Sequence, residues 1–174
     1  MIKILRNRKS VRKFSNEKIA EQDLKILKEC LLRAPSSRNK QPWEFIFVDS
    51  KILVEQLAES KLSGSQFLKN APLAIVIGGN ETISDVWIED CSIAAIILQL
   101  TAVSLNLGSC WIQIRNRMHD EKTSSEEFVQ NLLDIPKNIR ILSIIALGHP
   151  SQEKHPVYDD ELCHSKIKLN QYSA

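Results

Sequence analysis

The apolar positions of the chain follow two spacings, one typical of helices and one typical of strands. An apolar stripe at spacings of three and four residues predicts a helix that ends before Pro35, formed by Leu24, Leu27, Leu31 and Ala34. Short runs rich in β-branched and aromatic residues predict four strands, at residues 44–49, 74–77, 110–114 and 139–147. The chain therefore combines helices and strands.

The longest apolar run predicts a helix that begins near Asp85 or Trp87 and is closed by Gly108 as its C-terminal cap. Within this run, residues 91–114 carry no charge and are long enough to span a bilayer. The same stretch holds polar side chains at Ser92, Gln99, Thr101, Ser104, Asn106, Ser109 and Gln113. A helix buried in a globular core, or shared between subunits, explains this mixture better than a membrane span.

Two shorter helices complete the pattern. One is expected at 51–60, and another follows Ser124, which forms a capping box with Glu127. The pair Gly78 and Gly79 is expected to end the second strand. Helices and strands do not alternate regularly, and no repeat or linker divides them, so we expect a single α+β domain over residues 1–174.

The tail after Gly148 differs from the rest of the chain. Pro150 and Pro156 make residues 150–174 a poor core element. Apolar anchors remain in this tail at Tyr158, Leu162, Ile167, Leu169 and Tyr172. Two interpretations stay open at this point: the tail packs on a partner molecule, or it is a loose terminus.

Composition narrows the classes of function. The formal net charge of +2 is too small for a nucleic-acid surface, and no apolar stretch follows the basic amino end as a secretory signal requires. We therefore expect no nucleic-acid or membrane partner and a cytoplasmic location. The charge is uneven, however, because residues 3–18 hold seven cations and one anion, Glu17. That end is either simply solvated or meets a phosphate or an acidic partner.

The cysteine and histidine pattern indicates neither disulfides nor a metal. The four cysteines lie far apart without a Cys-x-x-Cys pair, as is typical of reduced thiols in a cytosolic protein. His149, His155, Cys163 and His164 gather near the carboxyl end, but their spacing matches no zinc pattern. We expect no metal site.

No catalytic nucleophile stands out either. The sequence lacks a Gly-x-Ser-x-Gly elbow, a phosphate loop ending in Gly-Lys-Ser/Thr, a His-Glu-x-x-His motif and a Gly-x-Gly-x-x-Gly fingerprint. A chain without these motifs either takes its chemistry from a cofactor or is not an enzyme.

Two polar clusters are candidates for binding. In an extended stretch, Arg8, Ser10 and Arg12 alternate and would project to one side, where two guanidinium groups and a hydroxyl suit a phosphate. The second cluster, residues 35–43, places hydroxyls and amides between two prolines that restrain the backbone. Such a rigid polar loop suits a ribityl chain or the edge of a heterocycle, and by composition alone it is also a plain turn.

These segments resemble the nitroreductase family of flavoproteins over nearly the whole chain. The two specific motifs, when they occur in this order, are Arg8-Lys9-Ser10-Val11-Arg12-Lys13-Phe14 and Ala34-Pro35-Ser36-Ser37-Arg38-Asn39-Lys40-Gln41-Pro42-Trp43. Weaker ones follow at residues 87–90, 107–112 and 144–150. The resemblance implies an α+β fold of the nitroreductase type, with a central mixed, mainly antiparallel sheet flanked by helices and a tail that reaches the partner subunit.

The resemblance also implies roles for individual residues. Arg8 and Ser10 would hold the phosphate of FMN, Lys9 would contribute mainly backbone contacts, and Arg12 would lie near the pyrimidine edge of the ring. A cation there stabilises the negative charge of the reduced flavin. The loop residues Pro35, Ser36, Ser37 and Asn39 would reach the flavin from the opposite subunit of a homodimer.

Two further regions are implied less directly. Gln113 and Arg115 fall where the family lines the flavin ring, although Gln113 alone reads as an ordinary polar residue at a strand end. Many family members complete the phosphate site with a basic residue of the tail. This tail has no arginine, so Lys154 is the nearest substitute, with Lys166 and Lys168 as further choices.

The implied activity is electron transfer from NADH or NADPH to a small acceptor, such as a nitroaromatic, a quinone, an enone or a flavin, by a ping-pong mechanism. The chemistry would occur at flavin N5 without a catalytic side chain, and Arg12 would give electrostatic support. Three alternatives remain: a specialised flavin reaction such as reductive dehalogenation, a non-catalytic flavin-binding or redox-sensing protein, and a nucleic-acid-binding module supported by the basic amino end alone.

Overall fold

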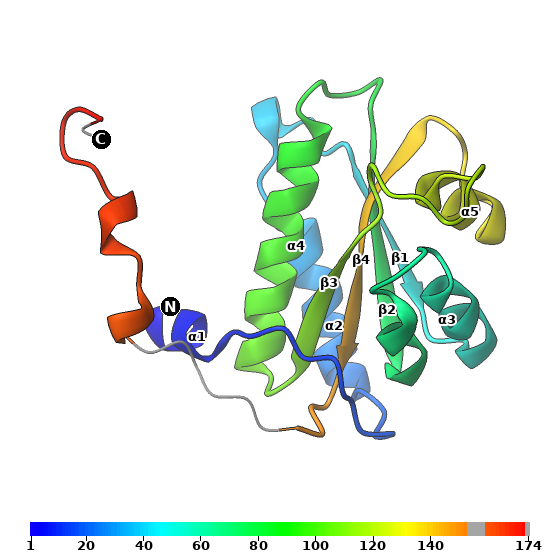
Figure 1. Cartoon of the computed structure of the whole chain (residues 1–174), viewed down its shortest axis with the longest axis horizontal. Helices are drawn as coiled ribbons and strands as arrows, with labels where there is room; N and C mark the ends of the chain where they lie inside the picture. The colour runs from blue at the N-terminus through cyan, green and yellow to red at the C-terminus, as the bar shows by residue number, and fades with distance from the viewer. Residues whose placement is uncertain (153–158, 173–174) are drawn as a thin grey trace.

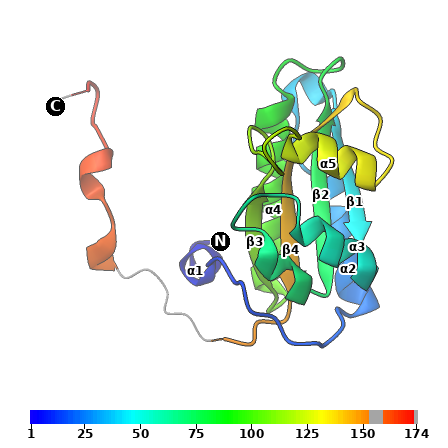
Figure 2. The same cartoon turned by 45° about the vertical axis from the view of Figure 1, so that its right-hand side comes forward.

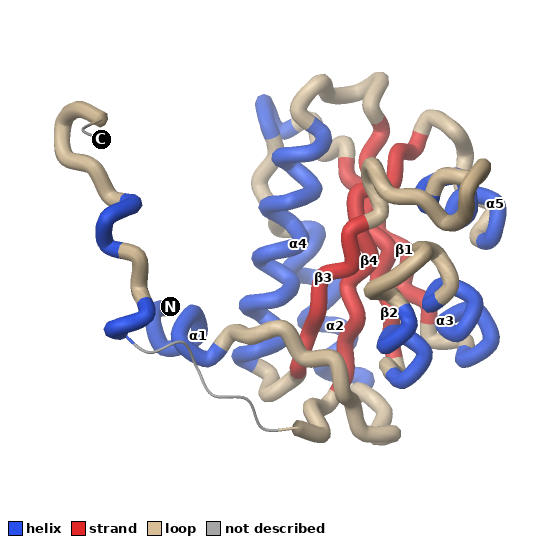
Figure 3. The backbone as a smooth tube through the Cα atoms, in the orientation of Figure 1, coloured by secondary structure: helices blue, strands red, loops and turns tan. Residues whose placement is uncertain are grey.

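A four-stranded sheet forms the centre of the computed structural model, which describes residues 1–152 and 159–172. The strands run in the order β1-β2-β4-β3, and each is paired antiparallel to its neighbour (Figures 1 and 3). Their bounds are β1 Trp43–Val48, β2 Leu73–Asn80, β3 Gly108–Gln113 and β4 Ile139–Gly148. The α+β class is confirmed. The sheet is antiparallel throughout, and parallel pairing occurs, within the described residues, only at an isolated bridge between Ser10 and Ser109.

Helices cover both faces of this sheet (Figure 1). On one side lie α2 (Glu21–Leu32) and α4 (Trp87–Ser104), and on the other lie α3 (Lys51–Ala58), α5 (Ser125–Leu132) and the short 3-10 helix η2 (Gln66–Asn70). Further short elements are α1 Ile2–Asn7, η1 Ser37–Asn39, η3 Asp159–Glu161 and η4 His164–Lys166. Of the α-helices, α1 is the one that the hydrophobic pattern did not predict.

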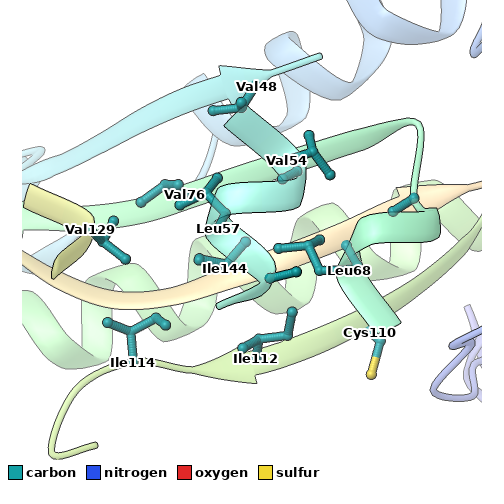
Figure 4. Close-up of a cluster of buried hydrophobic side chains, with 14 of the residues drawn as sticks. Val48, Val54, Leu57, Leu68, Val76, Cys110, Ile112, Ile114, Val129 and Ile144 are labelled. Atoms are coloured by element: carbon teal, nitrogen blue, oxygen red, sulfur yellow. The ribbon is translucent and has the colours of Figure 1, made fainter. Parts of the chain in front are cut away.

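The core consists of two clusters that alternate along each strand. In β4, Ile145 belongs to the cluster under α2 and α4, while its neighbour Ile144 belongs to the cluster under α3 and α5. Figure 4 shows the second cluster, where Val76, Ile112 and Ile144 from three strands meet α3 and η2. The alternation follows from strand geometry, since successive side chains point to opposite faces of a sheet.

The long apolar helix α4 packs against the sheet and α2, as expected of a core helix. It is long and apolar enough to cross a membrane by length and composition. Eight of its residues are nevertheless buried within this single chain, including Cys91, Ala94 and Leu98 at 0% exposure. Its outer side stays apolar, with Ile93 and Ile96 about 40% exposed. This exposed strip can meet a second molecule.

The structure corrects two expectations about glycines. Gly78 and Gly79 do not end β2, which continues through both to Asn80 across a β-bulge after Ile77. A side chain at Gly78 would lie 2.6 Å from the carbonyl oxygen of Arg140, so the glycine permits a close approach of two strands. Gly108 begins β3 and does not cap α4. The left-handed residue after that helix is Asn106, at φ 59°.

The N-cap half of the predicted capping box is confirmed, because the Ser124 hydroxyl accepts a hydrogen bond from the backbone N–H of Glu127 at 3.0 Å. The carboxylate of Glu126, also in this first turn, accepts hydrogen bonds from Arg140 Nη2 at 2.7 Å and from Arg140 Nε at 2.9 Å. Hydrogen bonding to Glu126 raises the pKa of Arg140 above its usual range. The pair ties α5 to the beginning of β4.

The described part of the tail extends away from the sheet and its helices (Figure 2). Its apolar side chains are exposed in the single chain, with Ile167 at 78%, Leu169 at 86% and Tyr172 at 85%. Side chains of this kind contribute to stability only when they are buried. The tail therefore has apolar surface available for contact with another molecule.

Gly108 provides a test of how the first residues are held on the sheet. An alanine Cβ at this position would lie 2.8 Å from the Cβ of Val11, which is 3% exposed. We expect Gly108→Ala to lower the free energy of unfolding by about 1–3 kcal/mol, the usual cost of overpacking. Urea denaturation of purified protein measures this loss.

The double variant Gly108→Ala/Val11→Ala should lose less stability than the sum of the two single losses, because Val11→Ala removes the two methyl carbons that lie 2.9 Å from the new Cβ and leaves the contact with the Val11 Cβ. Strictly additive losses in the double variant would show that the two residues do not compete for the same space.

Candidate functional site

The residues before α2 run along the outer edge of the sheet and are fixed there by backbone hydrogen bonds. We call Arg8–Ser15 the amino-terminal segment. Val11 N–H donates to Ser109 O at 2.9 Å, and Ser15 N–H donates to His149 O at 2.9 Å. Val11 and Phe14 are buried beneath the segment. Burial and hydrogen bonding together hold the intervening polar side chains in place beside β3.

Two arginines of this segment lie in different surroundings. Arg8 is half-buried at the end of α1, where its backbone is extended, with φ −65° and ψ 126°. Arg12 is exposed, and its guanidinium carbon lies 5.7 Å from the ring centroid of Phe67 in η2. Within residues 1–152 and 159–172, neither guanidinium has a carboxylate within 4.0 Å. Both charges are therefore available to an anion.

Lys9 and Ser10 lie between these arginines and are half-buried. Ser10 forms the isolated bridge to Ser109 at the beginning of β3. Among the described residues no further strand covers the outer edge of β3 past this bridge. An uncovered edge offers backbone N–H and C=O groups to a ligand.

The end of β3 is stabilised by its own polar side chains. The amide oxygen of Gln113 accepts a hydrogen bond from Trp111 Nε1 at 3.0 Å, and its Nε2 donates to Arg115 O at 2.9 Å. Arg115 is half-buried, and its backbone N–H donates to Leu142 O at 3.1 Å. Both predicted residues lie at the strand end, and the Gln113 amide holds the backbone there.

A second pair of cations lies beyond this strand end. Burial and the nearby charge of Arg117 lower the pKa of Lys61, which lies in the loop after α3. That loop is joined to the loop after β3 through Leu62 N–H, which donates to Met118 O at 3.1 Å. Sequence reasoning did not single out Lys61, Arg117 or Phe67, because only the folded chain brings them beside the predicted residues.

The predicted polar loop, residues 35–41, is called the serine loop here. Three of its residues have left-handed backbone, with φ 52° at Arg38, 53° at Asn39 and 48° at Gln41. Internal bonds support this shape. Gln41 N–H donates to Ser36 Oγ at 2.8 Å, and Gln41 Nε2 donates to Asn39 Oδ1 at 3.3 Å. Pro35 and Asn39 are exposed, whereas Ser36 and Ser37 are half-buried.

A buried carboxylate connects the serine loop to the core. Asp90, in the first turn of α4, is 3% exposed and accepts a hydrogen bond from Ser37 N–H at 2.8 Å. Its second oxygen is 3.4 Å from Ser84 Oγ. Sequence reasoning missed this role, since an acidic residue near a helix start is explained equally well by the helix dipole.

The serine loop and the amino-terminal segment lie at opposite ends of α4 (Figure 1). Asp90 holds the loop at the beginning of this helix, while Val11 packs on Gly108, which follows its end. At 1.5 Å per residue, the 18 residues of α4 measure about 27 Å. One chain therefore does not bring the two predicted groups of residues together.

The tail residues considered for the site are only partly described. Lys154 lies outside the described residues, as does His155. Lys166 is exposed in η4, and Lys168 Nζ lies 5.3 Å from the ring centroid of Tyr172. Among residues 1–152 and 159–172 no three His, Cys, Asp or Glu side chains gather as a metal site.

Comparison with known proteins places this fold in one family. The model of the Nitroreductase family matches residues 5–66 and 53–149. A solved structure described as an FMN-dependent nitroreductase, from Clostridium difficile R20291, is 40% identical in sequence. It superimposes with a TM-score of 0.97 over 99% of this chain and 100% of that one.

Curated relatives give the same result. A protein of Archaeoglobus fulgidus whose name describes it as an NADH dehydrogenase/NAD(P)H nitroreductase is 37% identical to this chain over 158 residues. The match covers 88% of this chain and 87% of that protein. The FMN reductase [NAD(P)H] of Bacillus subtilis is 26% identical over 98% of this chain and 75% of its own length.

Proposed function

The chain belongs to the nitroreductase family, and on this premise we propose that it is an FMN-dependent oxidoreductase that carries electrons from NADH or NADPH to a small acceptor. The names of its relatives support the cofactor and the nicotinamide donor. The observation that carries the proposal within this chain is the pair of arginines, Arg8 and Arg12, fixed beside the uncovered edge of β3 without carboxylate partners in the described residues.

The residues present fit the chemistry of FMN. Its phosphate is a dianion, and guanidinium groups bind phosphate through paired hydrogen bonds. Arg8 and Ser10 would hold this phosphate, with Lys9 beside them. The heterocycle carries hydrogen-bonding edges, which suit the uncovered backbone of β3 and the strand end at Gln113 and Arg115.

A homodimer would supply the remaining contacts. The serine loop lies about one α4 length away from the amino-terminal segment of the same chain, as the rise of this helix requires. Pro35, Ser36, Ser37 and Asn39 therefore serve the flavin of the partner subunit. The exposed apolar surface of α4 and of the tail supports such an assembly, because a stable interface buries side chains of this kind.

When bound, FMN supplies the two-electron chemistry that links a nicotinamide to an acceptor. The protein contributes position and electrostatics. Arg12 places a fixed positive charge near the cofactor, and Phe67 orients that guanidinium through its ring face. Lys61, Arg115 and Arg117 add positive charge at the end of β3, which favours phosphate-bearing donors and anionic acceptors.

Removing the two arginines tests whether they bind FMN, Arg8 at the phosphate and Arg12 at the ring. We expect Arg8→Ala/Arg12→Ala to raise the dissociation constant for FMN by at least about a hundredfold, because two charge-assisted interactions are lost. Titration of flavin-free protein with FMN, followed by quenching of flavin fluorescence, measures the change. The control is Lys25→Ala/Lys51→Ala, which removes the same charge from exposed positions. Equal FMN affinity in the two double variants would contradict the assignment.

The tail provides a test of the dimer. Ile167 is 78% exposed in the single chain, so Ile167→Ser should leave the fold intact. If the tail packs on the partner, the lost burial raises the dimer dissociation constant about tenfold. Sedimentation velocity over a concentration series measures it. Ile52→Ser is the matched control, since Ile52 in α3 is 70% exposed. An unchanged dimer in both variants would leave the tail without this role.

Kinetics test the use of one pocket by donor and acceptor in turn. Initial rates measured over a grid of NADH or NADPH and quinone concentrations should give parallel double-reciprocal lines, because the oxidised nicotinamide leaves before the acceptor enters. Intersecting lines would require both molecules to be bound together. A yellow protein that neither NADH nor NADPH bleaches under anaerobic conditions would instead indicate a non-catalytic flavin-binding protein.

A further inference from the structure

Asp90 is the buried acidic group that the proposed function does not use. It is 3% exposed, and its Oδ1 accepts the Ser37 backbone N–H at 2.8 Å. Among the described residues, its second oxygen accepts a hydrogen bond from the Ser84 hydroxyl alone, at 3.4 Å. No cation pairs with it within 4.0 Å in the described part of the chain. Burying a carboxylate without an ion-pair partner is costly, so its hydrogen-bond acceptance has to compensate.

The serine loop needs an external anchor. Arg38, Asn39 and Gln41 all have positive φ, a backbone region that is unfavourable for residues with a side chain. The other hydrogen bonds of residues 35–41 join the loop to itself, as in Gln41 N–H to Ser36 Oγ. Within the described residues, the bond from Ser37 to Asp90 is the one hydrogen bond that connects these seven residues to another element.

We propose that Asp90 is a positioning residue, which fixes the serine loop in the conformation that reaches the flavin of the partner subunit. This inference rests on the proposed function. Asp90 suits the task because α4 packs rigidly between the sheet and solvent, with Cys91 and Ala94 fully buried beside it. The N-terminal turn of α4 also stabilises a negative charge. A rigid helix thereby determines the position of a strained loop through one charge-assisted hydrogen bond.

Substitutions of Asp90 test the acceptor. Asp90→Asn keeps an oxygen at the position of Oδ1, whereas Asp90→Leu keeps the side chain's branching at Cγ and removes the acceptor. We expect Asp90→Leu to raise the dissociation constant for FMN at least about tenfold and Asp90→Asn to change it no more than about threefold, because only the first loses the hydrogen bond. Glu89→Leu, an exposed acidic residue in the same turn, is the control that should leave FMN affinity unchanged.

Substitutions of Ser37 test the donor and avoid any folding defect from a changed core. Ser37→Pro removes the backbone N–H, and the preceding Ser36 already has the extended backbone that a following proline requires, with φ −139° and ψ 156°. Ser37→Ala removes the hydroxyl and keeps the N–H. The proline variant should therefore bind FMN at least about tenfold more weakly than the alanine variant.

Amide hydrogen exchange of the flavin-free protein separates failure of this inference from failure of the proposed function. Exchange in a peptide covering residues 35–42 should accelerate at least about tenfold in Asp90→Leu and stay near the wild-type rate in Asp90→Asn. Unchanged exchange, or faster exchange with unchanged FMN affinity, would overturn the role of Asp90. A wild-type protein that binds no FMN would overturn the proposed function, and with it the inference drawn from it.

Discussion

The rigid helix α4 determines how the candidate site is divided. It is buried against the sheet along one side, so its two ends keep a fixed separation. At the beginning of this helix, Asp90 holds the serine loop through a hydrogen bond. Past its end, Val11 of the amino-terminal segment packs on Gly108. Because a helix of this length cannot bring its ends together, the proposed site joins residues from the two ends across a subunit boundary. The exposed Ile93 and Ile96 lie on the same helix, between these ends.

Much of the fold could be predicted from local sequence. The sequence predicts the four strands and the helices α2 to α5, from apolar patterns and, for α5, from the capping signal at Ser124, with boundaries displaced by a few residues. The errors occurred where a distant partner decides the structure. Gly78 looked like a strand end, but its missing side chain admits the Arg140 carbonyl. Gly108 looked like a helix cap, but it makes room for Val11. The six-residue helix α1 has no buried residue, and its apolar residues Ile2, Ile4 and Leu5 form a stretch too short to show a helical period.

The candidate site was predictable to the extent that its residues are consecutive. The Arg8 to Arg12 motif and the serine loop are short continuous stretches, so their residue types and order are visible in one sequence. Asp90, Phe67 and Lys61 act through contacts with residues far away along the chain. Asp90 lies in the weak motif at residues 87–90, but that motif does not show that Asp90 holds the serine loop. Asp90 and Ser37 are 53 positions apart. A contact at that separation follows from the packing of α4 and cannot be derived from local propensity.

The contact between Arg12 and Phe67 has a consequence for the electrostatics of the proposed site. A surface guanidinium is commonly held by a carboxylate, which orients it and also cancels its charge. An aromatic ring orients the guanidinium as well, since its face is negative, but it carries no net charge. With Phe67 as the partner, Arg12 stays oriented and keeps its full positive charge. In the proposed dimer, the partner's serine loop would contribute hydroxyl and amide groups of Ser36, Ser37 and Asn39. In that arrangement the amino-terminal segment would supply the positive potential, while the serine loop would supply hydrogen bonds from uncharged groups that do not oppose it.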